Sequence, residues 1–287
     1  MKNIIIKAIA RVTRRFHPRG TNRLLRLIYS PEGREFDHFE IVMKYDTRLL
    51  ININTADFLE WMIFFYGYHE PGLTRQIQRI FQPGFVAFDV GANVGSHSLI
   101  MSDRAGKDGK IFAVEPNPVA AQRLGENIAL NQLDNIVVLS SAFSDTPGEK
   151  KLFVPVEGTS NRGVASLYPE NVNYQRVEVP VEVITMDEVV RERGLSRLDF
   201  IKIDTEGNEL KVLRGARNCI AKYRPLIVFE YDLRSWSNSA TDFAVAKEYF
   251  SGLNYSLSVI GPRSLTTVGD DLPVTGNILA APKLISV

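Results

Sequence analysis

The chain has 287 residues, of which 45% are hydrophobic and 23% are charged, and its formal net charge is +1. This length and composition exclude a disordered chain, and the balanced charge excludes a protein that binds polyanions through its global charge. The single cysteine, Cys219, excludes an intrachain disulfide and a cysteine-based metal cluster, and it fits a reducing compartment. No apolar run approaches the roughly 20 residues needed to span a bilayer.

The N-terminal segment, residues 1–30, carries eight lysines and arginines and no acidic residue. Its larger apolar residues recur at roughly helical spacing: Ile5, Ile9, Val12 and Phe16. The segment is therefore predicted to form a basic amphipathic helix. Two interpretations stay open, because such a helix can lie on an anionic membrane surface or dock on the rest of the protein. The expected location is cytoplasmic, with residues 1–30 as a candidate peripheral contact with the inner face of the membrane.

The remainder of the segment 1–72 has the pattern of a small α+β appendage. Residues 39–44 and 49–53 flank a short turn and predict a hairpin, and an aromatic-rich helix follows from Thr55. Gly67 and Pro71 end that helix. A second helix is predicted over residues 73–81, at the start of the main domain, residues 73–287.

Strands and helices alternate from residue 84 onwards. Strands are predicted at residues 85–90, 110–114, 137–140, 198–203 and 225–229, with late strands near 255–260 and 278–281, and an additional strand after Pro147-Gly148. Helices are predicted at residues 96–105, 186–192, 208–222 and 242–250, and after Asn117-Pro118. The alternation predicts an α/β fold with a doubly wound, mostly parallel sheet, which binds its ligands at the carboxyl ends of the strands.

The first strand ends in a loop with the pattern Asp89-x-Gly91-x-Asn93-x-Gly95. Two glycines let the backbone turn tightly and approach a ligand. A loop for pyrophosphate would favour three glycines, and the carboxylate of Asp89 would repel a phosphate at close range. That carboxylate suits a ligand with a positive group, such as the sulfonium of S-adenosylmethionine. A tight turn without a ligand is the alternative interpretation.

Two further groups of acids lie at predicted strand ends. Glu115 follows Gly95 by about twenty residues, where a doubly wound nucleotide fold places the acid that accepts from ribose hydroxyls. Period-2 alternation puts Lys202 and Asp204 on one side of the fourth strand, Glu206 follows in the next loop, and Glu230 closes the fifth strand. Solvated carboxylates and structural ion pairs would produce the same pattern.

Four motifs occur in an order that resembles a known family. They are "FDVGANVGSHSL", "VEPNPVAAQRLGENIALN", "SSAFSDTPG" and "LDFIKIDTEGNELKVLRGA". Together they resemble the FkbM-type methyltransferases of the class I, S-adenosylmethionine-dependent superfamily, over about residues 84–232. The upstream "FYGYHEPG" is similar to the segment that precedes the first motif of this family, and it places Tyr68 and Glu70 near the cofactor.

The resemblance implies a seven-stranded Rossmann-like sheet with the last strand antiparallel, and S-adenosylmethionine as the cofactor. The implied cofactor-binding set is Glu70, Asp89, Gly91, Asn93, Gly95, Ser96, His97, Glu115, Pro116, Asn117, Ser141, Ala142 and Asp204. Within this set the glycine loop surrounds the methionine part, Glu115 binds the ribose, and His97 is a candidate donor to the cofactor carboxylate. Ser141 stands where many members of the superfamily carry an acid for the adenine amine, so backbone groups are expected to contribute there.

The family is associated mainly with O-methylation of hydroxyls on sugars, glycolipids and other secondary metabolites. A hydroxyl is a poor nucleophile at neutral pH, so a base or a metal must take its proton. We expect Asp204, supported by Lys202 and Glu206, to orient or deprotonate the acceptor. A rival arrangement uses Asp204, Glu206 and Glu230 as ligands of a magnesium-like divalent ion, but the sequence does not favour it, because strand-end acids are common without metal.

Two other function classes remain open. A nucleic-acid methyltransferase would use the basic N-terminal segment for phosphate contacts, although no RNA-binding module is recognisable and nucleic acid is not the expected partner. A catalytically inactive partner protein would bind the cofactor without turnover. The acceptor pocket is expected to be formed by the appendage, the loop at residues 157–176 and the segment after Glu230, with Tyr168, Tyr174 and Trp236 as candidate sugar-stacking rings. No residue pattern identifies the acceptor or the oligomeric state.

Overall fold

The computed structural model describes residues 2–16, 21–33, 36–156, 164–269 and 272–283. Its N-terminal part contains the helices α1 (Lys2–Arg15) and α2 (Thr21–Ile28), the hairpin strands β1 (Glu40–Tyr45) and β2 (Leu49–Asn54), and the helix α3 (Phe58–Tyr66). The predicted hairpin and aromatic helix are confirmed. The carboxylate of Asp57 caps α3, and Gly67 ends it in a left-handed conformation. Helix α4 (Pro71–Ile80) leads into the main sheet.

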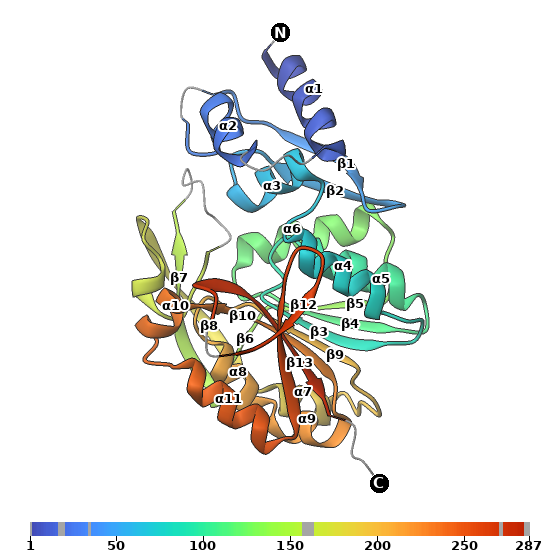
Figure 1. Ribbon diagram of the computed structural model, residues 1–287, viewed down its shortest axis with the longest axis vertical. Coiled ribbons are helices and arrows are strands. Elements are labelled where there is room, and N and C mark those ends of the chain that lie inside the picture. The colour runs from blue at the N-terminus through green and yellow to red at the C-terminus, as the bar shows by residue number, and fades with distance from the viewer. Residues whose placement is uncertain (1, 17–20, 34–35, 157–163, 270–271, 284–287) are drawn as a thin grey trace.

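The central sheet has eight strands in the order β12-β11-β13-β10-β9-β3-β4-β5 (Figure 1). The strands are β3 (Val86–Val90), β4 (Lys110–Val114), β5 (Ile136–Leu139), β9 (Phe200–Ile203), β10 (Leu226–Asp232), β11 (Tyr255–Ile260), β12 (Leu265–Thr267) and β13 (Thr275–Pro282). The five strands from β10 to β5 are parallel, and β13 runs antiparallel to both of its neighbours. The predicted mostly parallel sheet is thus confirmed, with the short β12 as an additional edge strand.

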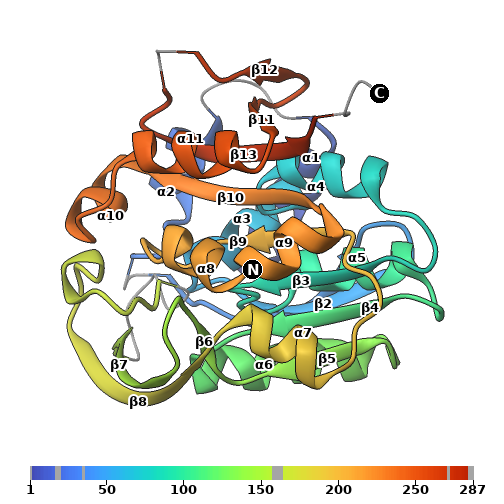
Figure 2. The ribbon, with the colours of Figure 1, turned by 90° about the horizontal axis from the view of Figure 1, so that it is seen from below.

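Apolar side chains along the central strands point alternately to the two faces of the sheet, and helices cover both faces. Phe88 of β3 and Ile201 of β9 pack on the face that holds α7 (Met186–Glu192), α8 (Glu209–Gly215), α9 (Arg217–Tyr223) and α11 (Phe243–Gly252). Their neighbours Ala87 and Phe200 pack on the opposite face, against α3, α4 and α5 (Ser96–Ala105). Figure 2 shows helices on both sides of the strands, with α6 (Pro118–Leu130) beside β4 and β5. The doubly wound arrangement therefore follows from the period of two in buried strands.

One predicted helix, over residues 208–222, is wrong: the structure contains two helices, α8 and α9, which meet at Ala216. The carboxylate of Asp187 in α7 accepts hydrogen bonds from the backbone N–H groups of Asn218 and Cys219, at 3.0 and 2.8 Å. These contacts satisfy donors in the first turn of α9, so α9 begins as a separate helix. Asp187 belongs to another helix, earlier in the chain and beyond the reach of local periodicity, so the sequence pattern does not show the break.

A second sheet has the strand order β6-β8-β7. Its strands are β6 (Ala142–Phe143), β7 (Gly148–Pro155) and β8 (Arg176–Ile184), and the 3₁₀ helix Pro169–Asn171 precedes β8. The strand predicted after Pro147-Gly148 is confirmed as β7. Strand β8 was not predicted, although its sequence RVEVPVEVI alternates. A short helix, α10 (Leu233–Asn238), after β10 was also missed.

The N-terminal part shares its core with the main sheet. Trp61 and Phe65 of α3 belong to the same buried cluster as Leu99 and Ile100 of α5. The buried carboxylate of Glu60 pairs with Arg123 of α6. The boundary between residues 72 and 73 stays a prediction. Within the described residues, no helix has the length and apolar character that crossing a membrane requires.

Candidate active site

A cavity of about 510 Å³ lies at the carboxyl ends of β3, β4, β9 and β10. This volume is in the range of small-molecule sites. Most residues of the predicted site line it: Gly91, Asn93, Ser96, His97, Glu115, Pro116, Ala142, Lys202, Asp204, Glu206 and Glu230. Five do not line it: Glu70, Asp89, Gly95, Asn117 and Ser141. The sheet topology therefore brings together residues from four separate motifs.

The two glycines of the first loop are required by neighbouring protein groups. Gly91 has a φ of +79°, and a Cβ atom there would lie 1.7 Å from the backbone oxygen of Asp204. Gly95 has a φ of +91°, and its Cβ would lie 2.6 Å from Leu124 Cδ1 in α6. The bare backbone thus lets the loop pack closely on the β9 loop and on α6. Gly91 also lines the cavity, so the close approach of this loop to a ligand stays a prediction.

Lys202 lies at the centre of a buried ionic group. Its Nζ is 3.2 Å from Asp204 Oδ2, 3.3 Å from Asp89 Oδ1 and 3.2 Å from the backbone oxygen of Gly91. Burial disfavours the lysine charge, but the charges of Asp89 and Asp204 outweigh this effect and raise the pKa of Lys202. Lys202 therefore stays protonated and holds the ends of β3 and β9 together.

Asp89 lies beneath the cavity and is completely buried. Its Oδ2 accepts a 2.6 Å hydrogen bond from the Ser98 hydroxyl, and Lys202 neutralises its charge. Lys202 Nζ lies within 3.3 Å of carboxylate oxygens of both Asp89 and Asp204, and Asp89 itself does not line the cavity. A direct contact between Asp89 and a positively charged ligand stays a prediction.

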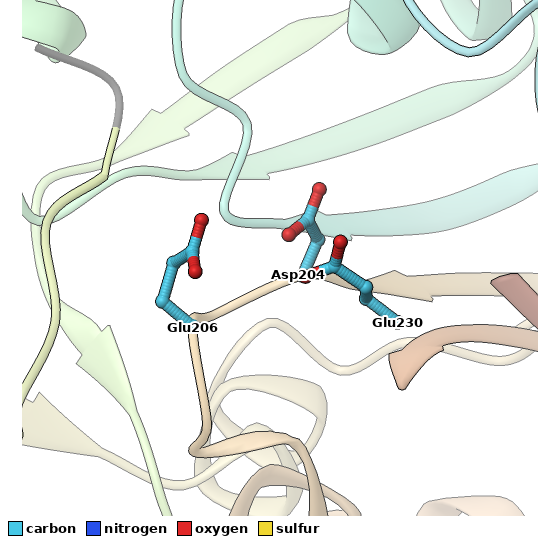
Figure 3. A group of neighbouring side chains, drawn as sticks. All are labelled: Asp204, Glu206 and Glu230. Atoms are coloured by element: carbon cyan, nitrogen blue, oxygen red, sulfur yellow. The ribbon is translucent and has the colours of Figure 1, made fainter. Parts of the chain in front are cut away.

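Three carboxylates project into the cavity from the end of β10 and the loop after β9 (Figure 3). Oxygen atoms of Asp204, Glu206 and Glu230 lie within 4.8 Å of one another. Burial, and then the nearby charge of Asp204, raise the pKa of Glu206 to about 8. The same two causes raise the pKa of Glu230 well above its ordinary value. Burial also opposes ionisation of Asp204, but the charge of Lys202 keeps the pKa of Asp204 below its usual value.

The loop that carries Glu206 has a constrained backbone. Glu206 adopts a φ of +55°, which is unfavourable for a residue with a side chain. Its backbone oxygen accepts hydrogen bonds from the Ser166 hydroxyl, at 2.8 Å, and from Asn171 Nδ2, at 2.7 Å. The carboxylate of Glu209 accepts from the backbone N–H groups of Thr205 and Gly207. Glu209, and not Glu206, therefore serves this turn as the capping acid.

On the other side of the cavity, Glu115 is fixed by backbone donors. Its two oxygens accept from the N–H groups of Asn93 and Asn117, at 2.8 and 2.9 Å. Burial raises the pKa of Glu115 to about 7. Asn117 caps α6 through Val119 N–H. The Ser141 hydroxyl donates to Glu182, at 3.0 Å, outside the cavity lining. Of the four residues predicted near the adenine, Pro116 and Ala142 line the cavity, and Asn117 and Ser141 do not.

His97 is buried at the cavity wall, and its Nε2 has no hydrogen-bond partner within the described residues. Burial, and then the charges of Lys202 and His69, lower the pKa of His97 well below its ordinary value. The ring is therefore neutral at pH 7. Ser96, beside it, uses its backbone oxygen to accept from the Tyr45 hydroxyl at 2.8 Å. Glu70 lies outside the lining, where its Oε1 accepts from Asn277.

Sequence reasoning missed several lining residues. The appendage contributes Phe58, Leu59 and His69, and the regions expected to form the acceptor pocket contribute Val164, Ala165, Leu167, Asn171, Asn173, Asp232, Arg234 and Ser235. All three expected regions thus contribute to the lining, and their role as the acceptor pocket stays a prediction; residues 157–163 of the loop lie outside the described part of the chain. None of the three candidate stacking rings lines the cavity. Trp236 packs in the core against Phe229 and Tyr231.

Residues 89–257 match the family of the methyltransferase FkbM domain. The chain belongs to this family. The similar curated proteins include methyltransferase sdnD of Sordaria araneosa, with 35% identity over 44% of this chain and 58% of that protein. The hexuronic acid methyltransferase AglP of Haloferax volcanii is 31% identical over 50% of this chain and 54% of its own length. The 2-O-methyltransferase NoeI of Sinorhizobium fredii is 32% identical over 55% of this chain and 68% of its own length.

The chain spans little more than half of the first two relatives. Among solved structures, the FkbM methyltransferase of Methylobacillus flagellatus KT aligns with 72% of this chain and 50% of its own, at a TM-score of 0.43 and 16% identity. Membership of this family implies S-adenosylmethionine as the cofactor.

The cavity residues fit this cofactor. When bound, S-adenosylmethionine supplies a methyl group on a positively charged sulfonium. The unpartnered Nε2 of neutral His97 offers a hydrogen bond on the glycine-loop side. Glu115 lines the cavity at the end of β4, the position of the ribose-binding acid in doubly wound folds. The acids at the ends of β9 and β10 favour a positive charge nearby, because the half-buried carboxylates otherwise repel one another.

Proposed function

We propose that this chain catalyses S-adenosylmethionine-dependent O-methylation of a hydroxyl group on a sugar, glycolipid or secondary metabolite. The observation that carries the proposal is the group Asp204, Glu206 and Glu230, which lies in the same cavity as the glycine loop of the family. Methyl transfer to a hydroxyl needs an acceptor for the hydroxyl proton, and these carboxylates can supply one. One similar protein is a hexuronic acid methyltransferase and another is a 2-O-methyltransferase, which supports a carbohydrate acceptor.

Within this group, Glu206 is a better candidate for the general base than Asp204. A base works best when its pKa is near the working pH, and the pKa of Glu206 is raised to about 8. Asp204 is held by Lys202 as a stable anion, with a lowered pKa. We therefore assign the orientation of the acceptor to Asp204 and the removal of its proton to Glu206. This assignment changes the order of roles that the sequence suggested.

Glu230 completes the group as a protonated partner. The pKa of Glu230 is raised well above its ordinary value, and a hydrogen bond with Asp204 connects the two side chains. A shared proton lets two adjacent carboxyl groups coexist without repulsion. The rival arrangement places a divalent ion among the same oxygens, which would replace that proton.

The outer wall of the cavity suits a polar acceptor with an apolar face. Phe58 and Leu59 of α3 provide apolar surface, and Asn173, Asp232 and Arg234 provide hydrogen-bonding groups. Sugar hydroxyls pair well with amide, carboxylate and guanidinium groups. Arg234 Nη2 donates a hydrogen bond to Asn173 Oδ1 at 2.5 Å. Because a guanidinium has five N–H donors, this bond leaves others that can reach an acceptor substrate.

The proposal is tested with the purified chain, labelled S-adenosylmethionine and four acceptors: a uronic acid glycoside, a neutral glycoside, a hydroxylated metabolite and RNA. Label transfer to one of the first three is the expected result, and label transfer to RNA alone would favour the nucleic-acid alternative. Cofactor binding without transfer to any acceptor would favour the inactive partner protein.

The variant Glu206→Gln should lower kcat by about 100-fold or more while leaving cofactor affinity nearly unchanged, since it removes only the base. Glu192→Gln, on the exposed side of α7, is the matched control. Full turnover of Glu206→Gln would refute the role of Glu206. Loss of activity on chelation, with recovery on addition of Mg²⁺, would instead support the metal arrangement.

A further inference from the structure

The N-terminal helices expose an unusual share of the apolar surface. Of the fifteen large hydrophobic side chains that are exposed within the described residues, seven belong to α1, α2 and the residue after α1: Ile4, Ile5, Val12, Phe16, Leu24, Leu27 and Ile28. Val12, Phe16 and Leu27 are 61%, 62% and 76% exposed. A concentration of exposed apolar residues in one part of a chain indicates an interaction surface.

Helix α1 has two apolar faces, and only one is used inside the protein. Ile6 and Ala10 are buried in the core shared with α3, and the Thr13 hydroxyl donates to the backbone oxygen of Phe65 at 2.6 Å. The stripe predicted from the sequence is a different face. Its spacing of i, i+4, i+7 and i+11 puts Ile5, Ile9, Val12 and Phe16 on one side, where all except the half-buried Ile9 are exposed.

Helix α2 repeats this arrangement. Leu25 and, just after the helix, Tyr29 are buried, and the backbone oxygen of Tyr29 accepts from Trp61 Nε1 at 2.7 Å. Leu24, Leu27 and Ile28, at the spacing i, i+3 and i+4, remain exposed. Both helices therefore dock on α3 and stand at the same end of the molecule (Figure 1). Each of these two helices thus packs on the protein with one face and exposes an apolar stripe on another.

Basic side chains accompany the exposed stripes. Arg11 and Arg15 are exposed on α1, and Arg23 and Arg26 are exposed on α2. No acidic residue occurs before Glu32, so neither helix carries an acidic residue of its own. An apolar stripe bordered by arginines matches the interface of an anionic bilayer, where the apolar groups enter the acyl boundary and the arginines meet the phosphates.

We propose that the exposed faces of α1 and α2, which we call the N-terminal docking face, bind the surface of an anionic phospholipid membrane without crossing it. The face lies next to the cavity rim. The guanidinium of Arg26 stacks over the Phe58 ring, 4.8 Å from its centroid, and Phe58 lines the cavity. Docking therefore brings the cavity rim close to the lipid surface. The proposal does not depend on the methylation reaction and can fail separately from it.

Flotation with lipid vesicles tests this inference on the full chain. We expect binding to vesicles of phosphatidylcholine mixed with an equal amount of phosphatidylglycerol, and much weaker binding to phosphatidylcholine alone. The double variant Val12→Glu/Leu27→Glu should weaken binding by about ten-fold or more, because it places charges in the acyl boundary. The control Val274→Glu changes a residue that is 71% exposed outside the docking face, and it should bind normally.

A second set of variants tests the charge. Arg11→Gln, Arg15→Gln and Arg23→Gln should each weaken binding to the anionic vesicles by about five-fold. All variants should keep wild-type affinity for S-adenosylmethionine, which shows that they are folded. No binding of the wild-type chain to anionic vesicles overturns the proposal. Loss of a dimer in the double variant, measured by sedimentation, also overturns it, because the face then binds a second copy. Salt-sensitive RNA binding that needs the arginines but not Val12 and Leu27 overturns it as well.

Discussion

Replacing Gly91 with alanine tests why the first loop has a bare backbone. A methyl group at this position would lie 1.7 Å from the backbone oxygen of Asp204 and 2.8 Å from its carbonyl carbon, so the β3 and β9 loops must separate. The φ of +79° adds a cost of about 1–2 kcal/mol for a residue with a side chain. Forced separation of packed groups adds about 1–3 kcal/mol. The expected loss in the free energy of unfolding is therefore about 2–5 kcal/mol.

Gly194→Ala is the matched control for the backbone strain. Gly194 also has a positive φ, of +59°, but a Cβ there meets nothing within 4 Å. Its expected cost is only the conformational part, about 1–2 kcal/mol. Urea unfolding of both variants, with and without S-adenosylmethionine, measures the difference. Gly91→Ala should also bind the cofactor more weakly, because its loop has moved. Equal losses of stability in the two variants would refute the steric explanation.

Three further predictions concern the carboxylates and the loops around them. The pKa of Glu206 is raised to about 8 in the folded chain, so its contribution to stability is present below about pH 4.5 and is lost as the pH rises towards 8. Thermal denaturation of the cofactor-free chain should show a loss of stability over this range, of at most about 1.4 kcal/mol per pH unit from this group. The variant Glu206→Gln should reduce this dependence on pH. Arg123→Met leaves the buried Glu60 without its partner and should cost about 3 kcal/mol or more at pH 8, measured by urea unfolding, and less at pH 5.5, because the pKa of Glu60 is about 7. Asn171→Ala removes the hydrogen bonds to the backbone oxygens of Glu206 and Ser235 and should lower kcat or raise the acceptor KM, while the cofactor Kd is unchanged.

Each of these predictions has a result that contradicts it. A pH slope of the same size in Glu206→Gln would show that Glu206 does not titrate in this range. An equal cost of Arg123→Met at both pH values would mean that Glu60 keeps its charge. A change confined to the cofactor Kd in Asn171→Ala would place the loop at residues 164–171 on the cofactor side of the cavity.

Local patterns in the sequence predicted most strands and helices of the central domain and the order of the motifs, but not β8, α10 or the break between α8 and α9. The alternation of strand and helix patterns predicted the five parallel strands, and Asn117-Pro118 marked the start of α6, which the Asn117 side chain caps. These features rest on contacts within a few residues, which the sequence displays directly. The family resemblance, over motifs that follow one another along the chain, is confirmed by the match at residues 89–257.

The roles within the site depend on contacts between distant segments, and only the tertiary structure decided them. Lys202 of β9 pairs with Asp89 of β3, which belongs to a different motif far earlier in the chain, so Asp89 supports the site from below. Position 91 requires a glycine because the backbone oxygen of Asp204 would lie only 1.7 Å from a Cβ atom there. Burial and mutual repulsion, which depend on where each side chain lies, raise the pKa of Glu206 while Lys202 lowers that of Asp204. The sequence thus determined which residues gather at the strand ends, and the packing of those ends determined which of them remain available for chemistry.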